Sequence, residues 1–280
     1  MKSAALAFRI ANVSMALAIV ATLGTLFLSS LGCSAPTEPA NALDRDDSLA
    51  IRAILGANRH TWPTEYWRIG RNSSGRATSL QFNGYGLDTI PAAIGNLFAL
   101  TELNLSDNKL RALPHEMDAL TELTDLRLNH NQLVKLPDGI RLPKLTHLDI
   151  SANHLTALPT NVDVTQVSIL QLDSNRIQSL PPDFRFLTAL SVFGIRDNLL
   201  DSLPADFSGV THPALRRLDV SGNRLVSLPA GFPTLALEWV DVGRNRICFP
   251  NPAQPDSAHG AMAQWLDGLD RDWRTTQQCP

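Results

Sequence analysis

Apolar residues recur along most of the chain in one fixed pattern, LxxLxLxxNxLxxLP. The stretch LTELNLSDNKLRALP, residues 100–114, matches this pattern at every position. Repeats with such a period indicate a solenoid, in which one structural unit stacks on the next. Eight copies follow one another at intervals of 22 to 25 residues, beginning at Ala77, Leu100, Leu123, Leu145, Val167, Leu190, Leu215 and Leu237.

Each copy combines two hydrophobic patterns of different period. Leu103 and Leu105 alternate with polar residues, which predicts a strand with one buried face. After the LP pair, Met117 and Leu120 follow at a spacing of three, which favours a short helical or 3₁₀ turn on the convex side. One strand and one turn cannot bury their own apolar edges, so each coil depends on its neighbours.

An asparagine recurs where the chain leaves each predicted strand. Its amide can donate to and accept from backbone groups that the turn frees, so we interpret these asparagines as a structural ladder between coils. The first copy has Tyr85 at this position, as suits a terminal coil. The ladder asparagines are Asn108, Asn131, Asn153, Asn175, Asn198, Asn223 and Asn245.

These copies resemble the leucine-rich repeat family over residues 77–250. The resemblance implies an α/β solenoid, a horseshoe of about eight repeats with a parallel concave β-sheet and a cap at each end. We place the N-terminal cap at residues 45–76 and the C-terminal cap at residues 251–280.

The two predicted caps have helical patterns of their own. Residues 46–59 begin with an aspartate cap and continue as an amphipathic helix, and two strands are expected around the turn at residues 72–75. Trp62 and Trp67 are expected to pack in this cap, although a ligand site is the alternative. The second helix is expected at residues 258–269, with Met262, Trp265, Leu266 and Leu269 on one side.

The N-terminus predicts export. Residues 10–31 contain no charged side chain, and Lys2 and Arg9 precede them. The stretch SSLGCS, residues 29–34, resembles the lipobox of bacterial lipoproteins, which implies a signal peptide at 1–32, acylation of Cys33 and a tether at 33–44. Ser34 after the cysteine favours the outer membrane in that family. A cleaved secretory signal and an uncleaved N-terminal anchor remain the alternatives.

The chain has three cysteines. Cys248 interrupts the last repeat and Cys279 is the penultimate residue, so we predict a disulfide between them in an oxidising compartment. A redox-active pair is the alternative, but there is no CxxC motif and no nearby basic cluster.

The composition argues against several functional classes. A formal charge of -3 without a basic cluster does not suit a nucleic-acid partner. The motifs GxSxG, GxxxxGK[ST] and HExxH are missing, so we predict neither catalysis nor a cofactor. We expect His130 and His147 on adjacent strands near Asp125 and Asp149. A fortuitous metal site is conceivable there, but a polar strand face collects such groups by default, so we predict no metal.

The outward positions of the predicted strands form the candidate binding face. Exposed apolar residues beside arginines are typical of a binding patch, and they gather in the C-terminal half. The alternative is that Ile169 and Val192 are only strand formers and that Trp239 packs on the C-terminal cap. The candidate ligand-binding residues are Arg127, His147, Ile169, Val192, Arg196, Arg217 and Trp239.

We therefore expect a monomeric, surface-tethered binding module that recognises a protein or peptide, with a glycan as the alternative ligand. A structural or self-associating envelope protein without a discrete ligand is the competing hypothesis. Repeat scaffolds serve unrelated tasks, so this functional expectation rests on the site and not on the fold.

Overall fold

The computed structural model describes residues 43–59, 69–159, 165–247, 258–269 and 276–277. The predictions for the signal peptide and Cys33, for Trp62 and Trp67, and for the Cys248–Cys279 disulfide lie outside these residues.

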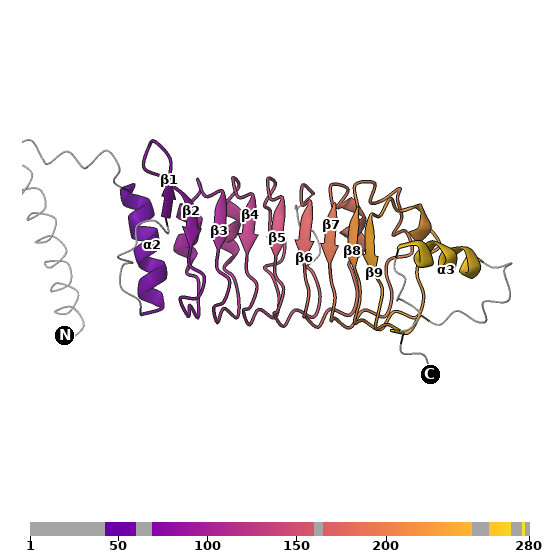
Figure 1. Ribbon diagram of the computed structural model, residues 1–280. Coiled ribbons are helices and arrows are strands. Elements are labelled where there is room, and N and C mark those ends of the chain that lie inside the picture. Colours follow the sequence, from indigo (N-terminus) through magenta and orange to yellow (C-terminus); the bar gives the residue numbers. More distant parts are fainter. Residues whose placement is uncertain (1–42, 60–68, 160–164, 248–257, 270–275, 278–280) are drawn as a thin grey trace, which may run out of the picture. The chain divides into compact units, whose positions relative to one another are not determined.

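One sheet of nine strands runs along the described chain in sequence order, as Figure 1 shows. The first two strands pair antiparallel, and each later strand pairs parallel with the one before it. This confirms the predicted parallel solenoid. The strands are β1 (Ile69–Arg71), β2 (Ala77–Gln81), β3 (Glu102–Asn104), β4 (Asp125–Arg127), β5 (His147–Asp149), β6 (Ile169–Gln171), β7 (Val192–Gly194), β8 (Arg217–Asp219) and β9 (Trp239–Asp241).

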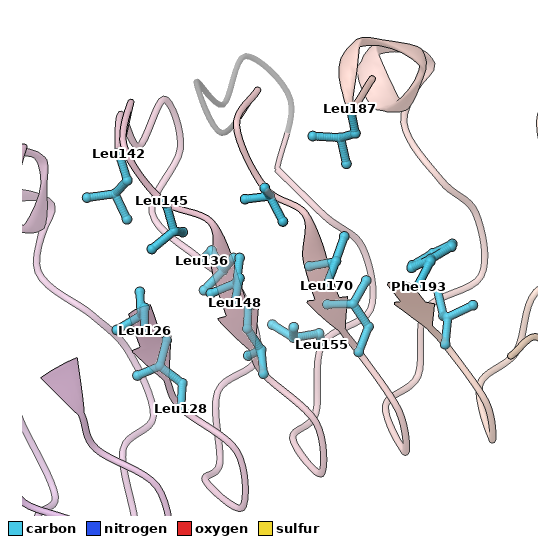
Figure 2. Packing of buried hydrophobic residues seen from close by; sticks show 14 of the residues in the cluster. Leu126, Leu128, Leu136, Leu142, Leu145, Leu148, Leu155, Leu170, Leu187 and Phe193 are labelled. Carbon is cyan, nitrogen blue, oxygen red and sulfur yellow. The ribbon is translucent and has the colours of Figure 1, made fainter. Parts of the chain in front are cut away.

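The core lies behind this sheet, along the whole solenoid. The middle residue of each short strand points inward, and Leu103, Leu126 and Leu148 stand opposite one another in register. Figure 2 shows Leu126 and Leu148 stacked with leucines from the neighbouring turns. Because every coil contributes one such layer, the apolar core is continuous from coil to coil.

Short 3₁₀ helices cover several coils on the convex side, as the apolar spacing predicted. Three of them start directly after a proline, whose fixed φ suits the entry to a helical turn. They bury Ile94, Met117, Phe184 and Phe232 against the core. The helices are η2 (Ala92–Asn96), η3 (His115–Ala119), η4 (Pro182–Phe186) and η5 (Phe232–Thr234).

The ladder asparagines join each coil to the one before it. Asn131 Oδ1 accepts a hydrogen bond from Leu110 N at 3.0 Å, and its Nδ2 donates to Leu105 O and to Leu128 O at 2.9 Å each. The same arrangement recurs up to Asn245. Each buried amide therefore satisfies a backbone N–H and carbonyl groups that the turn would otherwise leave unpaired.

A second ladder, made of hydroxyl groups, runs beside the strands. The repeat pattern did not predict it. Thr101 Oγ1 donates to Thr78 O at 3.0 Å, and Thr124 Oγ1 donates to Thr101 O at 2.9 Å. Thr146, Ser168 and Ser191 continue the series. The signal was present in the sequence, because each of these residues directly follows the first apolar residue of a repeat.

The N-terminal cap consists of α2 (Arg45–Ala57) and the β1–β2 hairpin. Asp44, two residues before the expected start, is the helix cap, and its Oδ1 accepts from Asp46 N at 2.9 Å. Asp47 is fully buried, accepts a hydrogen bond from Ala77 N at 2.6 Å and pairs with Arg76 Nη2 at 2.6 Å. Burial raises the pKa of Asp47, and the bond from Ala77 opposes that rise.

The C-terminal cap contains α3 (Ala258–Leu269), with the predicted bounds. Met262 and Leu266 are buried in the continuous core, and the Trp265 ring meets Phe232 edge-on with centroids 5.5 Å apart. Within the part of the chain that the structure describes, no helix has the length and apolar composition needed to cross a membrane.

Gln277 closes the asparagine ladder at the C-terminal end. Its Oε1 accepts from Ile247 N at 3.1 Å, and its Nε2 donates to Val242 O at 3.0 Å. A ladder asparagine in a further coil would make the same two bonds, because Ile247 lies two residues after Asn245 as Leu225 does after Asn223. The preceding Thr276 carbonyl accepts from Arg244 N at 3.1 Å, so this short segment replaces the missing next coil.

Candidate binding face of the sheet

Residues that alternate with the core leucines form two registered columns on the open face of the sheet. Each member stands directly opposite its equivalent on the neighbouring strand. The first column is Ser79, Glu102, Asp125, His147, Ile169, Val192, Arg217 and Trp239, and the second is Gln81, Asn104, Arg127, Asp149, Gln171, Gly194, Asp219 and Asp241.

The N-terminal half of this face is polar and internally paired. The Arg127 guanidinium binds both oxygens of Asp125, with Nε to Oδ1 at 3.0 Å and Nη2 to Oδ2 at 3.1 Å. His147 Nδ1 lies 3.2 Å from Asp125 Oδ2 on the other side. The hydrogen bonds that Arg127 donates to Asp125 raise the pKa of Arg127. A polar hollow of about 150 Å³ lies among Gln81, Glu102, Leu103, Asn104, Asp125 and Arg127.

His130 does not lie beside His147 as the sequence suggested. It occupies the turn after β4 with a φ of 56°, and its Nδ1 lies 3.1 Å from Asn129 Nδ2 and 3.8 Å from Asp107 Oδ1. The two histidines therefore lie beside different carboxylates, His147 beside Asp125 and His130 beside Asp107. Among the described residues, no group of three or more His, Cys, Asp or Glu side chains is arranged to hold a metal ion.

The C-terminal half carries the apolar and aromatic candidates. Ile169 and Val192 are neighbours in the first column and are half-buried. Trp239 has 45% of its surface exposed, so the described part of the C-terminal cap does not bury it. Arg217, its cross-strand neighbour, is exposed and forms no ion pair with any residue that the structure describes.

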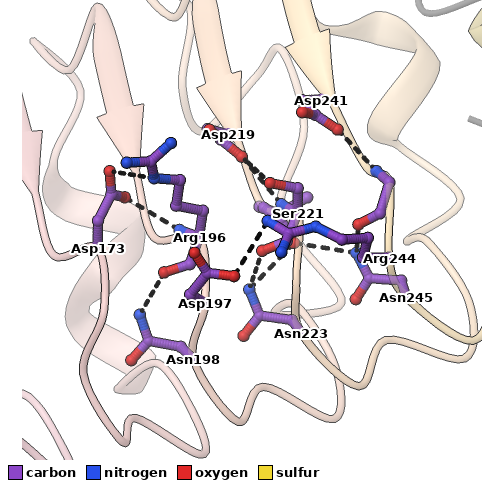
Figure 3. Close-up of polar contacts among 12 residues, drawn as sticks. Asp173, Arg196, Asp197, Asn198, Asp219, Ser221, Asn223, Asp241, Arg244 and Asn245 are labelled. Carbon is purple, nitrogen blue, oxygen red and sulfur yellow. Dashed lines mark hydrogen bonds and ion pairs between the residues drawn. The ribbon is translucent and has the colours of Figure 1, made fainter. Parts of the chain in front are cut away.

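Arg196 is less available than the sequence suggested, because Asp173 holds it. Arg196 Nε lies 3.2 Å from Asp173 Oδ2, and Arg196 N donates to Asp173 Oδ1 at 3.0 Å, as Figure 3 shows. Gly194 leaves the space for this carboxylate, because a Cβ there would lie 2.9 Å from Asp173 Oδ1. Burial raises the pKa of Asp173 to about 6, and nearby Asp219 adds to the rise.

Several acidic residues of the second column stabilise the turns that follow their strands. Asp149 Oδ1 accepts from Ser151 N at 2.9 Å, Asp219 Oδ1 from Ser221 N at 3.0 Å, and Asp241 Oδ1 from Gly243 N at 2.8 Å. Asn104 makes the equivalent bond to Ser106 N. One side-chain oxygen of each of these residues thus holds a turn, and each aspartate still contributes its negative charge to the face. The C-terminal half of the face therefore carries the negative charges of Asp219 and Asp241 beside its arginines.

An apolar cavity of about 370 Å³ lies apart from this face, within the coils of β4 to β6 and beside η4. Leu148, Leu170 and Phe184 form part of its wall, and the exposed Phe186 lies at its border. The repeat pattern does not reveal it, because the pattern marks the wall residues as ordinary core positions. The groups that surround it favour only apolar contacts.

Comparison with known proteins agrees with this architecture. The leucine rich repeat family model matches residues 79–133 and 165–225. A leucine-rich repeat protein of Leptospira interrogans is 30% identical, aligned over 69% of this chain and 47% of that chain, with a TM-score of 0.58. Drosophila Toll, solved in complex with Spatzle, is 22% identical over 69% of this chain and 30% of that chain, with a TM-score of 0.54. No curated protein matches the chain.

The stacked parallel strands define a β-solenoid with one open sheet face. Its repeats match the leucine rich repeat model over residues 79–133 and 165–225, and the fold is similar to that of the Leptospira leucine-rich repeat protein. The chain spans less than half the length of either solved protein.

Proposed function

We propose that this protein is a recognition module that binds a protein or peptide on the concave face of its sheet. Leucine-rich repeat proteins commonly mediate protein binding, and the Toll structure named above is a complex with Spatzle. The observation that carries the proposal is Trp239, an exposed aromatic side chain beside Arg217, which forms no ion pair with any described residue. Tryptophan and arginine are the residues most enriched where binding energy concentrates.

The test compares capture of envelope proteins by the purified full chain and by two concave variants, Trp239→Ala and Arg217→Glu. Phe186→Ala is the matched control, because Phe186 is an exposed aromatic residue (51%) in η4, outside the sheet. We expect both concave variants to lose the captured partner while the control retains it. Equal capture by all three, with unchanged thermal unfolding, would reject the concave face as the binding surface.

We further propose that the protein is exported and tethered to a bacterial outer membrane through acylated Cys33. The support is the uncharged run at residues 10–31 and the lipobox-like SSLGCS stretch. One acyl chain binds membranes only marginally, so firm attachment requires the several chains of that lipoprotein class. Labelled palmitate should enter the wild-type chain and not Cys33→Ser. Label that persists in the variant would show that Cys33 is not the acylated residue.

A further inference from the structure

The last two strands place like charges opposite each other on the candidate face. Asp219 and Asp241 are cross-strand partners, and each commits Oδ1 to a backbone N–H two residues along. Neither carboxylate forms an ion pair with a Lys or Arg among the described residues. Directly opposed like charges in a sheet are destabilising. The pKa of Asp219 is raised by burial first and by Asp241 in addition.

Among the described residues, no arginine forms an ion pair with Asp219 or Asp241, although the charge of Arg196 is close enough to lower the pKa of Asp219. Arg196 is held by Asp173, and Arg244 Nη2 lies 3.0 Å from Asp197 Oδ1. Arg216 donates to two backbone carbonyls, those of Pro213 and Leu215. Arg217 on β8 forms no ion pair within the described part of the chain, so one positive charge lies beside two negative ones on these strands. The surface of β8 and β9 is therefore complementary to a cation.

The apolar part of the face lies two strands away. Ile169 and Val192 on β6 and β7 occupy the same column as Arg217 and Trp239 on β8 and β9. Neighbouring strands are about 4.8 Å apart, so the two pairs are centred about 9.6 Å from each other. A polyproline II segment advances about 3.1 Å per residue and returns to the same side every three residues, or about 9.3 Å. Its side chains i and i+3 match this spacing.

We propose that β6 to β9 bind a polyproline II segment of a partner protein, with an apolar residue at position i and a lysine or arginine at i+3. This inference rests on the proposed function and names its ligand. The apolar side chain covers Ile169 and Val192. The basic side chain lays its aliphatic stem along Trp239 and reaches one pleat further, to the carboxylates of Asp219 and Asp241. Arg217 donates to the carbonyls of the segment, which a polyproline II helix leaves free.

The experiment measures binding of labelled proline-rich peptides to the purified full chain by fluorescence anisotropy. Each peptide carries one leucine and one lysine, separated by two, three or four positions, and a further peptide has glutamate for lysine at the spacing of three. We expect the spacing of three to bind about tenfold more tightly than the others, and the glutamate peptide to lose binding. Equal affinity at all three spacings, or tighter binding of the glutamate peptide, would overturn the inference.

A paired substitution tests the carboxylates directly. Asp219→Asn with Asp241→Asn keeps the oxygen that accepts the backbone N–H, as Asn104 does in the same column. We expect this variant to lose about tenfold in affinity for the lysine peptide and nothing for a glutamine analogue. Asp138→Asn, at a side chain with 82% exposure outside the sheet, is the control. Equal losses for the lysine and glutamine peptides would refute recognition of the positive charge.

Failure of this inference differs from failure of the proposed function. If Trp239→Ala abolishes capture of a native partner but no peptide shows the spacing preference, the concave face binds something of other chemistry and the polyproline II ligand is rejected. If Trp239→Ala leaves native capture unchanged, the binding face itself is wrong.

Discussion

Arg244 reaches across one whole coil to pair with Asp197, at 3.0 Å between Nη2 and Oδ1. The coil between them contributes Gly222, which is in register with both and has no side chain to separate them. A Cβ at Gly222 would lie 2.3 Å from Asp197 Oδ1, which is well inside van der Waals contact distance. This pair therefore ties three successive coils together at the edge of the candidate face, as Figure 3 shows.

Gly222→Ala should destabilise the fold by about 1–3 kcal/mol, since the left-handed backbone (φ 65°) and the clash with Asp197 both oppose a side chain. Urea unfolding followed by circular dichroism measures this change. Gly84→Ala is the matched control: its φ is 72°, but nothing lies within 4 Å of the added Cβ. The control should show the backbone strain alone. If both variants lose the same free energy, the Asp197–Arg244 pair does not depend on the gap at Gly222.

Removal of a ladder asparagine in the middle of the solenoid should destabilise the fold more than Gly222→Ala does. Asn175→Ala removes the acceptor of Leu155 N and the donor to Ile150 O and Leu172 O, all at 3.0 Å. The buried Leu155 N loses its acceptor, whereas Ile150 O and Leu172 O keep Asn153 Nδ2 and Asn198 Nδ2 as donors. With one unsatisfied buried donor and two further hydrogen bonds lost, we expect a loss of about 2–4 kcal/mol in unfolding free energy. Asn83→Ala, at an exposed asparagine of the first coil, should change it by less than about 0.5 kcal/mol.

A small effect of Asn175→Ala would mean that water replaces the amide. A drop in the urea m-value would show that unfolding has split at this coil, because each repeat is held only by its neighbours.

The fold follows from the sequence because its cause is periodic. Leucines at fixed spacing must stack to be buried, and that requirement places every strand in the observed register. The charges of the face are harder to predict, since they depend on side chains more than twenty residues apart. Asp173 can hold Arg196 only because Gly194 lies beneath it, and the repeat pattern treats all three positions as interchangeable outward residues.

Trp239, unlike these charges, could be identified as a candidate from the sequence. A single aromatic residue at an outward strand position marked the face in the sequence, and its exposure in the structure keeps it as a candidate. The hydroxyl ladder was missed for a different reason: a Thr or Ser after the first apolar residue is too common to be read as a signal until the register is known.

Asp173 predicts a specific dependence of stability on pH. Its folded pKa is about 6, above the ordinary 3.8, so the folded state holds this proton more tightly than the unfolded state does. Between these two values, stability therefore falls as pH rises. Asp173→Asn should remove this contribution and flatten the thermal unfolding midpoint between pH 4 and 6. Asp138→Asn, at an exposed aspartate, should leave the profile as in the wild type. An unchanged slope in Asp173→Asn would show that burial does not perturb this carboxyl.

The side-chain hydrogen bonds of Gln277 should stabilise the C-terminal end of the solenoid. Gln277→Ala removes the acceptor of Ile247 N, at 3.1 Å, and one of the donors to Val242 O, at 3.0 Å, while Asn245 Nδ2 still donates to Val242 O. We therefore expect a loss of about 1–3 kcal/mol in unfolding free energy, mainly from the unpaired Ile247 N. Gln264→Ala, at an exposed glutamine of α3, is the control and should be nearly neutral. The measurement is urea unfolding, with and without a thiol reductant.

The reductant separates the two attachments of the tail. Cys248 follows Ile247 directly, and Cys279 lies two residues after Gln277, so the predicted disulfide would hold the same segment that the glutamine bonds. With the disulfide intact, the tail loses little entropy on docking and stays docked without the glutamine, so the variant should lose the full contribution of its hydrogen bonds. With the disulfide reduced, the tail can detach, so Gln277→Ala can cost no more than the free energy of docking and should cost less than it does in the oxidised chain. A wild-type unfolding free energy that the reductant leaves unchanged would contradict the predicted Cys248–Cys279 bond.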